Sequence, residues 1–179
     1  MMGYILPLHA LWSRFRGNRD GGASNEFVIV FPLVFAVFAA LVETGWTATR
    51  IVMLDRGLDI TARNLRLGYS TAVTHQSIKT EVCEHATLLF NCERDLVIEL
   101  VPMAANDPYP QSQLLCRDRV NNVNPVLSFN PGARTNLMFI RACMVVDPIL
   151  PGIGLGLALP KDASGGYQMV SYTAFKNEP

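Results

Sequence analysis

Residues 27–42 read FVIVFPLVFAVFAALV, a run with no charged side chain. The next ionisable residues are Glu43 and Arg50. As one helix, residues 27–49 extend about 35 Å at a rise of ~1.5 Å per residue, which exceeds the ~30 Å hydrocarbon core of a bilayer. This stretch therefore predicts a helix that crosses a membrane once.

A buried core helix, or the apolar region of a secretory signal, is the alternative interpretation of this run. A secretory signal needs small residues at a cleavage site after the apolar region, and residues 42–46, VETGW, are a poor match. Pro32 is compatible with a membrane helix, because neighbouring groups satisfy the carbonyl that a proline frees.

Charge asymmetry predicts the orientation of the helix. Residues 1–22 contain Arg14, Arg16 and Arg19 against Asp20, whereas the whole chain has a formal net charge of zero. Basic residues before a span keep the N-terminus in the cytoplasm, so residues after about 50 should be exported. Trp46 then lies near the outer interface, where its amphipathic ring is favoured.

Length and charge narrow the function classes. At 179 residues the chain has room for one domain, or for one small domain and a membrane segment. The part after the span is near neutral and has no basic stripe, which argues against binding to nucleic acid.

The junction before the span carries a recognisable pattern. Residues 19–32 read RDGGASNEFVIVFP: a basic leader, a glycine, small or polar residues, then Glu26 and Phe27 at the start of an apolar helix. This arrangement resembles the processing site of type IV pilin-like precursors. The resemblance implies that an inner-membrane prepilin peptidase cuts after Gly21, which makes Gly22 the first residue and Glu26 the fifth. A carboxylate in lipid is costly until it is paired, and the resemblance implies pairing with the α-amino group of a neighbouring subunit.

Further residues are similar to the TadE/TadF branch of pseudopilins, and most similar to TadE-like proteins of tight-adherence (Tad/Flp) pilus loci. The similar segments are Glu26-Phe27, Pro32, residues 41–45 (LVETG), residues 137–143 (LMFIRAC) and residues 170–175 (VSYTAF). Glu43 is a secondary candidate site, and its alternative interpretation is an interfacial residue that reaches the headgroups.

The resemblance implies a minor pseudopilin that supports pilus assembly or initiation through helix packing. The expected organisation is a cytoplasmic leader (1–21), a transmembrane helix (22–49) and a periplasmic αβ domain (50–179) on a single-pass inner-membrane protein. Expected partners are another TadE/TadF-like pseudopilin, a Flp-type major pilin, the inner-membrane assembly platform, the prepilin peptidase and membrane lipid. No cofactor or metal is expected.

The exported part predicts an α+β domain. Apolar residues recur at helical spacing after the span, so the membrane helix should continue as an amphipathic helix up to about Gly68. A second helix is expected over 77–90 with Ser77 as its cap, and strands over 95–101, 136–146 and 167–175. The predicted fold is pilin-like: a long N-terminal helix packs with the second helix on a small antiparallel sheet.

Two loops are expected in this domain. Residues 102–134 contain five prolines and several asparagines, which predicts an irregular surface connection or, alternatively, a surface for a partner. Residues 148–159, PILPGIGLGLAL, are too short and broken to span a membrane. We expect a buried loop or hairpin there, and peripheral membrane contact is the alternative.

All four cysteines follow the span: Cys83, Cys92, Cys116 and Cys143. An exported domain lies in an oxidising compartment, which favours two disulfides, and no spacing matches a usual zinc site. Three connectivities are possible. We favour Cys83 with Cys92 and Cys116 with Cys143.

A membrane-anchored periplasmic enzyme or sensor domain is the alternative class. The histidines are His9, His75 and His85, and the sequence has no Gly-x-Ser-x-Gly, His-Glu-x-x-His or phosphate-binding loop. We therefore expect a protein that acts by recognition and packing rather than by catalysis.

Overall fold

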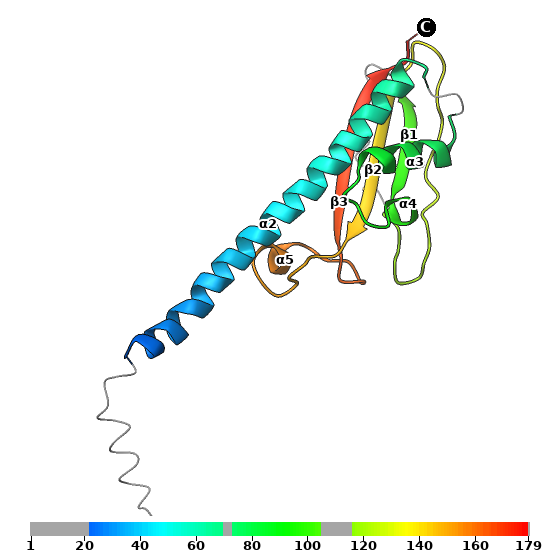
Figure 1. Cartoon of the computed structure of the whole chain (residues 1–179). Coiled ribbons are helices and arrows are strands. Elements are labelled where there is room, and N and C mark those ends of the chain that lie inside the picture. The colour runs from blue at the N-terminus through cyan, green and yellow to red at the C-terminus, as the bar shows by residue number, and fades with distance from the viewer. Residues whose placement is uncertain (1–21, 70–72, 105–115, 179) are drawn as a thin grey trace, which may run out of the picture.

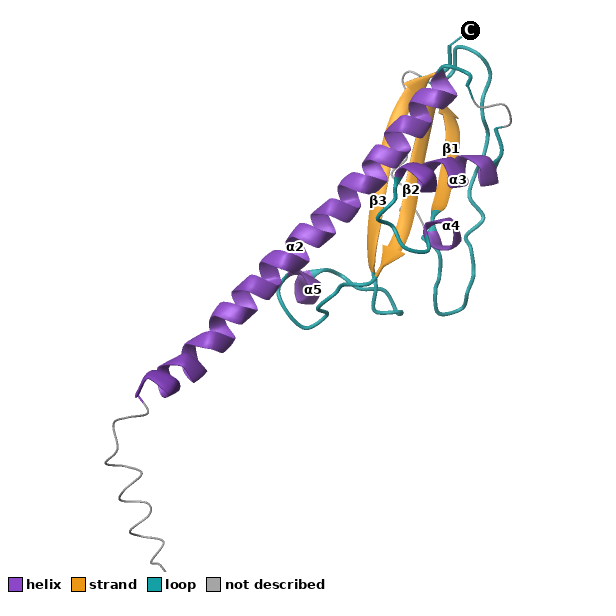
Figure 2. Ribbon diagram, in the orientation of Figure 1, coloured by secondary structure: helices purple, strands orange, loops and turns teal. Residues whose placement is uncertain are grey.

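The computed structural model describes residues 22–69, 73–104 and 116–178. Helix α2 (Gly22–Arg66) comes first, followed by α3 (His75–His85), α4 (Cys92–Asp95) and β1 (Val97–Met103). β2 (Leu137–Val146), α5 (Leu155–Ala158) and β3 (Tyr167–Lys176) complete the described elements (Figures 1 and 2). The α+β class predicted from the sequence is confirmed.

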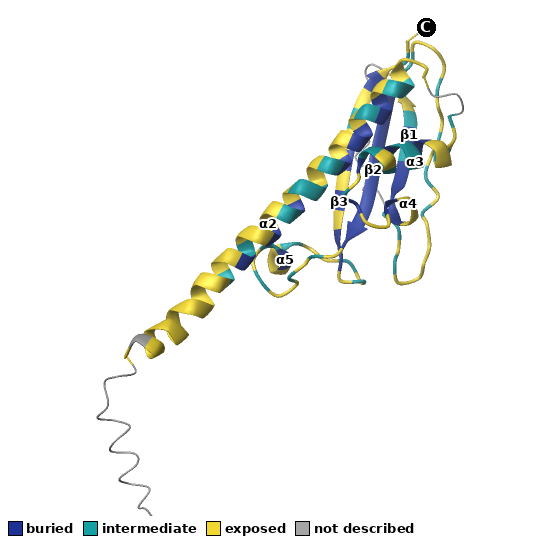
Figure 3. Ribbon diagram, viewed as in Figure 1, coloured by how far each residue is buried: buried dark blue, intermediate teal, exposed yellow. Residues whose placement is uncertain are grey.

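α2 is one continuous helix of 45 residues that contains Pro32. Its first half projects away from the domain, and from residue 24 to residue 38 no side chain is buried (Figure 3). From Ala39 on, one side of the helix is buried at steps of four or seven residues, at Ala39, Glu43, Thr47, Leu54, Leu58 and Ala62. Such spacing places these side chains on one face, which packs against the rest of the domain.

The sheet is antiparallel in the order β1-β2-β3. Val97 lies opposite Cys143 in the first pair, and Val146 lies opposite Tyr167 in the second. β2 is the central strand and is buried along nearly its whole length, and one of its two faces packs with residues of α2 and α3. Alternate residues of β2 enter that core: Met138, Ile140, Ala142, Met144 and Val146.

α3 differs from its predicted bounds at both ends. Thr74, and not Ser77, is the N-cap, and Ser77 is the third helical residue of a capping box: each side chain bonds the other residue's backbone N–H. The helix ends at His85, and the chain turns at Asn91, which has a positive φ of 54°, before α4. The predicted start was wrong because, in a capping box, a Thr and a Ser three residues apart are hard to tell apart as the cap from sequence.

The three predicted strands are present, with shifted ends. Asp95 lies in α4 rather than in the first strand, so β1 begins at Val97. In the predicted 102–134 connection, the described part after residue 116 is irregular apart from a short antiparallel bridge between Asp118 and Val123 and a contact with β1. The Leu100 N–H donates to the Ser128 carbonyl at 3.1 Å, and the Asn130 N–H donates to the Leu100 carbonyl at 2.8 Å. Residues 128–130 therefore lie along the outer edge of β1.

Disulfides link Cys83 to Cys92 and Cys116 to Cys143. The first joins α3 to α4, and the second joins the long connection to the central strand β2. This is the connectivity that the sequence favoured. All four cysteines of the chain are paired, so the native protein has no free thiol.

Candidate functional site

The side chain of Glu43 makes the most unusual contact of α2. It is 1% exposed, and its two carboxylate oxygens accept hydrogen bonds from the backbone N–H groups of Ile149 (3.1 Å) and Leu150 (3.0 Å). A buried carboxylate is costly unless it is hydrogen-bonded, and two amide donors provide that compensation. Glu43 therefore joins α2 to the segment between β2 and β3.

The segment between β2 and β3 also approaches α2 at Ala40, one turn closer than Glu43 to the N-terminus of the helix. Gly154 lies so near the helix that a Cβ there would be 2.7 Å from the Cβ of Ala40. Gly154 also has a positive φ of 58°, a conformation that a side chain disfavours. Only small residues on both sides permit this approach, so Ala40 and Gly154 form a second contact point between helix and loop.

A group of polar contacts surrounds Asp147, where the chain leaves β2. Arg50 donates to the backbone carbonyl of Asp147 at 2.8 Å, and its guanidinium lies 5.2 Å from the centre of the Trp46 ring. Arg119 binds both carboxylate oxygens of Asp147, at 2.8 and 2.7 Å. The hydrogen bond from Arg119 lowers the pKa of Asp147, and the same bond raises the pKa of Arg119.

A cavity of about 190 Å³ lies beside these contacts. Its lining includes three arginines, Arg50, Arg94 and Arg119, and two acidic residues, Asp95 and Asp147. Arg94 binds Asp95 through two hydrogen bonds of 2.9 Å, and Arg119 binds Asp147. Carboxylates therefore pair two of the three arginines, while Arg50 is bonded to a backbone carbonyl.

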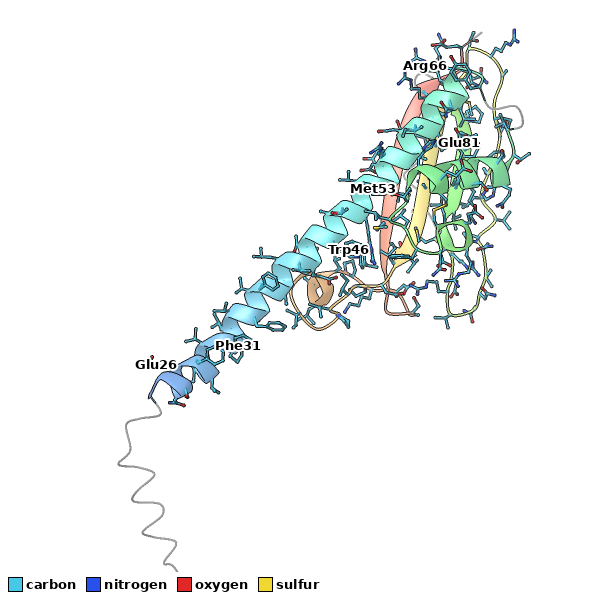
Figure 4. All side chains as sticks on the ribbon, in the orientation of Figure 1. Glu26, Phe31, Trp46, Met53, Arg66 and Glu81 are labelled. Carbon is cyan, nitrogen blue, oxygen red and sulfur yellow. A yellow bond between two sulfur atoms is a disulfide. The ribbon has the colours of Figure 1, made fainter. Side chains whose placement is uncertain are left out.

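The residues predicted at the processing site lie at the other end of α2. Gly21 lies outside the described residues, and Gly22 is the first residue of α2. Glu26 and Phe27 are exposed on the first turns, and the rings of Phe27 and Phe31 stack with centroids 5.0 Å apart. Figure 4 shows Glu26 and Phe31 on the projecting part of the helix, well away from Trp46.

The structure does not bring the two glutamate candidates together. Seventeen residues separate Glu26 from Glu43, which corresponds to about 26 Å along a helix. The interpretation of Glu43 as an interfacial side chain that reaches outward is wrong, because the loop encloses its carboxylate. Glu26, in contrast, is exposed and is available to another molecule.

Sequence reasoning missed the partners of Glu43. Ile149 and Leu150 contribute backbone N–H groups, and a backbone donor leaves no mark in the side-chain pattern. The expectation of a buried loop over 148–159 is also wrong: Gly156 alone is buried among these residues. The sequence signals were the glycines of this loop and the pair of alanines at 39 and 40, which allow two backbones to approach closely.

The described histidine contacts are structural in character. His75 Nε2 lies 3.2 Å from the Ile98 carbonyl, and its ring meets Phe129 edge to face. Within residues 22–69, 73–104 and 116–178, no group of three His, Cys, Asp or Glu side chains is arranged to hold a metal. His9 lies outside the described residues.

Among the described residues, one helix is long and apolar enough to cross a membrane, the part of α2 over Ser24–Arg66. Together with the two disulfides, it fits a single-pass membrane protein with a domain on one side. Comparison with models of known protein families, with curated proteins and with solved structures finds no match to this chain.

Proposed function

We propose that this protein is a TadE-like minor pseudopilin of a tight-adherence pilus system. In this proposal the leader is cytoplasmic, α2 crosses the bacterial inner membrane, and the αβ domain is periplasmic. The protein supports pilus assembly or initiation by packing its long helix against the helices of other subunits.

One observation supports this proposal most directly: no side chain of α2 from residue 24 to residue 38 is buried by the described part of the domain. From residue 24 to residue 38 the described side chains are exposed or half-buried, and the exposed set includes five large apolar residues of one short stretch: Phe27, Val28, Ile29, Val30 and Phe31. A projecting apolar helix that continues into a packed domain suits a subunit that is anchored in lipid and can join a helical assembly.

The position of Glu26 also supports it. The carboxylate lies at the start of the projecting half, where an unpaired charge in lipid is costly and a positively charged partner is favoured. A free α-amino group on a neighbouring subunit, produced by cleavage after Gly21, is such a partner. The proposed partners are a second TadE/TadF-like pseudopilin, a Flp-type major pilin and the assembly platform.

N-terminal peptide mapping of protein extracted from membranes of cells that carry a prepilin peptidase tests the proposal. The expected N-terminus is Gly22, and Gly21→Phe should leave the leader attached because the side chain obstructs the peptidase cleft. Gly17→Phe is the matched control within the leader and should be processed normally. A wild-type chain that still begins at Met1 or Met2 would contradict the proposal.

Glu26→Ala tests a later step. Cleavage should proceed because the scissile bond is unchanged, but crosslinking to other pilus subunits should fall to background. Asn25→Ala, at the adjacent position, should crosslink as the wild type does. If membrane-extracted protein copurifies with no pilus component, a membrane-anchored enzyme or sensor becomes the better interpretation.

A further inference from the structure

The connection between β2 and β3 includes a segment with no ionisable side chain. We call residues 148–159, PILPGIGLGLAL, the apolar loop; Asp147 precedes it and Lys161 is the first charged residue after it. Two of its large side chains face outward, Ile149 with 49% exposure and Leu157 with 66%. Exposed apolar side chains close together indicate an interaction surface, and the neighbouring helix indicates what covers it.

α2 provides a scale for the position of the apolar loop. If the hydrocarbon core begins at Phe27, its ~30 Å correspond to about 20 helical residues and end near Trp46. The loop contacts α2 at Glu43 and, through Gly154, at Ala40. Ala40 precedes Trp46 by six residues, or about 9 Å along the helix. The tip of the loop therefore lies beside the span, within the depth that lipid covers.

The backbone of the apolar loop suits surroundings of low polarity. Pro148 and Pro151 have no N–H group. Six other residues donate their N–H to acceptors in the protein: Ile149, Leu150, Ile153, Leu157, Ala158 and Leu159. Hydrogen bonds within the protein therefore satisfy six of the ten backbone N–H groups of this segment, which lowers the cost of placing irregular backbone next to lipid.

Polar groups lie at the ends of the apolar loop. Asp147 is held by Arg119 and its carbonyl accepts from Arg50, while Lys161 Nζ donates to the Pro151 carbonyl at 2.8 Å. Long basic side chains beside an apolar surface are typical of the boundary between acyl chains and headgroups. Charged ends and an uncharged middle match the polarity profile of a membrane interface.

We propose that the apolar loop inserts into the leaflet on the domain's side of the membrane, with phospholipid acyl chains covering Ile149 and Leu157. The inference depends on α2 crossing a membrane and is independent of any role in a pilus. Because Glu43 fixes the loop to α2, insertion sets how the domain is tilted against the bilayer. The domain then meets the membrane at two places, the span and the loop.

Depth-dependent quenching in vesicles tests this inference. The full chain carrying Leu157→Cys is labelled with a polarity-sensitive dye, since no native thiol competes, and is reconstituted into phosphatidylcholine and phosphatidylglycerol vesicles. Lipids with a nitroxide near the top of the acyl chain should quench this dye at least about threefold more strongly than a dye at Val126. Aqueous iodide should show the reverse order.

The control positions make each outcome informative. Val126→Cys carries the label at a fully exposed apolar residue of the long connection, and Phe35→Cys carries it within the span. Ile149→Cys is a second position in the apolar loop and should behave like Leu157→Cys. Equal iodide access at 157 and 126 would overturn the inference. Protection that disappears on dilution of the protein in lipid would also overturn it, because a second copy would then cover the loop.

Discussion

The carboxylate of Glu43 and the backbone N–H of Leu150 form a 3.0 Å hydrogen bond across 107 residues of sequence. Glu43 directly follows the uncharged run of residues 27–42 in α2. The bond joins this part of the helix to the segment that connects β2 and β3. Ile149 donates to the other carboxylate oxygen at 3.1 Å. The membrane helix and the domain are therefore connected by a specific polar contact as well as by the packed core.

Glu43→Leu should release the apolar loop from α2. The substitution leaves two backbone N–H groups without their acceptors, at a cost of about 1–3 kcal/mol each if they stay buried, so the loop should open locally instead. Hydrogen exchange at Ile149 and Leu150 in the reconstituted protein should become faster. Glu43→Gln keeps one acceptor oxygen and should have a smaller effect. Thr44→Ala, on the exposed side of α2, is the control, and equal exchange in all variants would show that the contact does not hold the loop.

Gly57→Ala should destabilise the contact between α2 and α3. A Cβ at this position would lie 2.6 Å from the Val82 carbonyl oxygen, so the two helices must separate. Overpacking of this kind costs about 1–3 kcal/mol, which denaturant unfolding in detergent would measure. Gly45→Ala is the matched control on the same helix, where a Cβ meets nothing within 4 Å. Equal stability of the two variants would contradict the close approach.

The two disulfides should be found in protein purified without reductant. Non-reducing peptide mass spectrometry should recover Cys83 linked to Cys92 and Cys116 linked to Cys143. By the chain-entropy estimate, loops of these lengths contribute up to about 2.7 and 3.6 kcal/mol to the free energy of unfolding. The reduced protein should unfold at lower denaturant concentration. Four free thiols in native protein would contradict export of the domain to an oxidising compartment.

Acid should weaken the domain in part through Asp95. Asp95 is 4% exposed, and hydrogen bonds from Arg94 hold the pKa of its carboxyl below the usual value. A folded-state pKa below the unfolded value of about 3.9 stabilises the folded state at higher pH, and this contribution disappears as pH falls through the folded-state pKa. Asp95→Asn should therefore cost about 1–2 kcal/mol at neutral pH and less in acid.

Unfolding of the Asp95→Asn variant between pH 7 and pH 2 measures this difference. Hydrogen bonds also lower the pKa values of Asp118 and Asp147. The wild type and the Asp95→Asn variant should therefore both lose stability in acid. The difference between the two curves isolates Asp95. Asp59→Asn, at an exposed position on α2, should match the wild type at neutral pH. A constant difference down to pH 2 would show that the Arg94 contact does not act through ionisation.

The membrane helix and the strands could be predicted because their signals are local. An uncharged run over 27–42 and helical spacing at Leu54, Leu58 and Ala62 are visible within a few turns, and these residues form α2 as expected. Strands rich in β-branched residues and bounded by Pro, Gly and Asn were found to within a few residues. The start of α3 was misplaced because its cap depends on reciprocal hydrogen bonds between side chains and backbone N–H groups, at Thr74 and Ser77.

A long apolar helix, an α+β domain and enough cysteines for two pairs could therefore be predicted from the residues alone. Three features depend on how the chain folds back: the domain meets α2 from Ala39 onward, Glu43 is enclosed, and the apolar loop lies beside the span. They could not be predicted because the antiparallel sheet returns the chain to α2 after more than a hundred residues. The partners it brings there are backbone N–H groups, which every residue but proline carries and no sequence pattern marks.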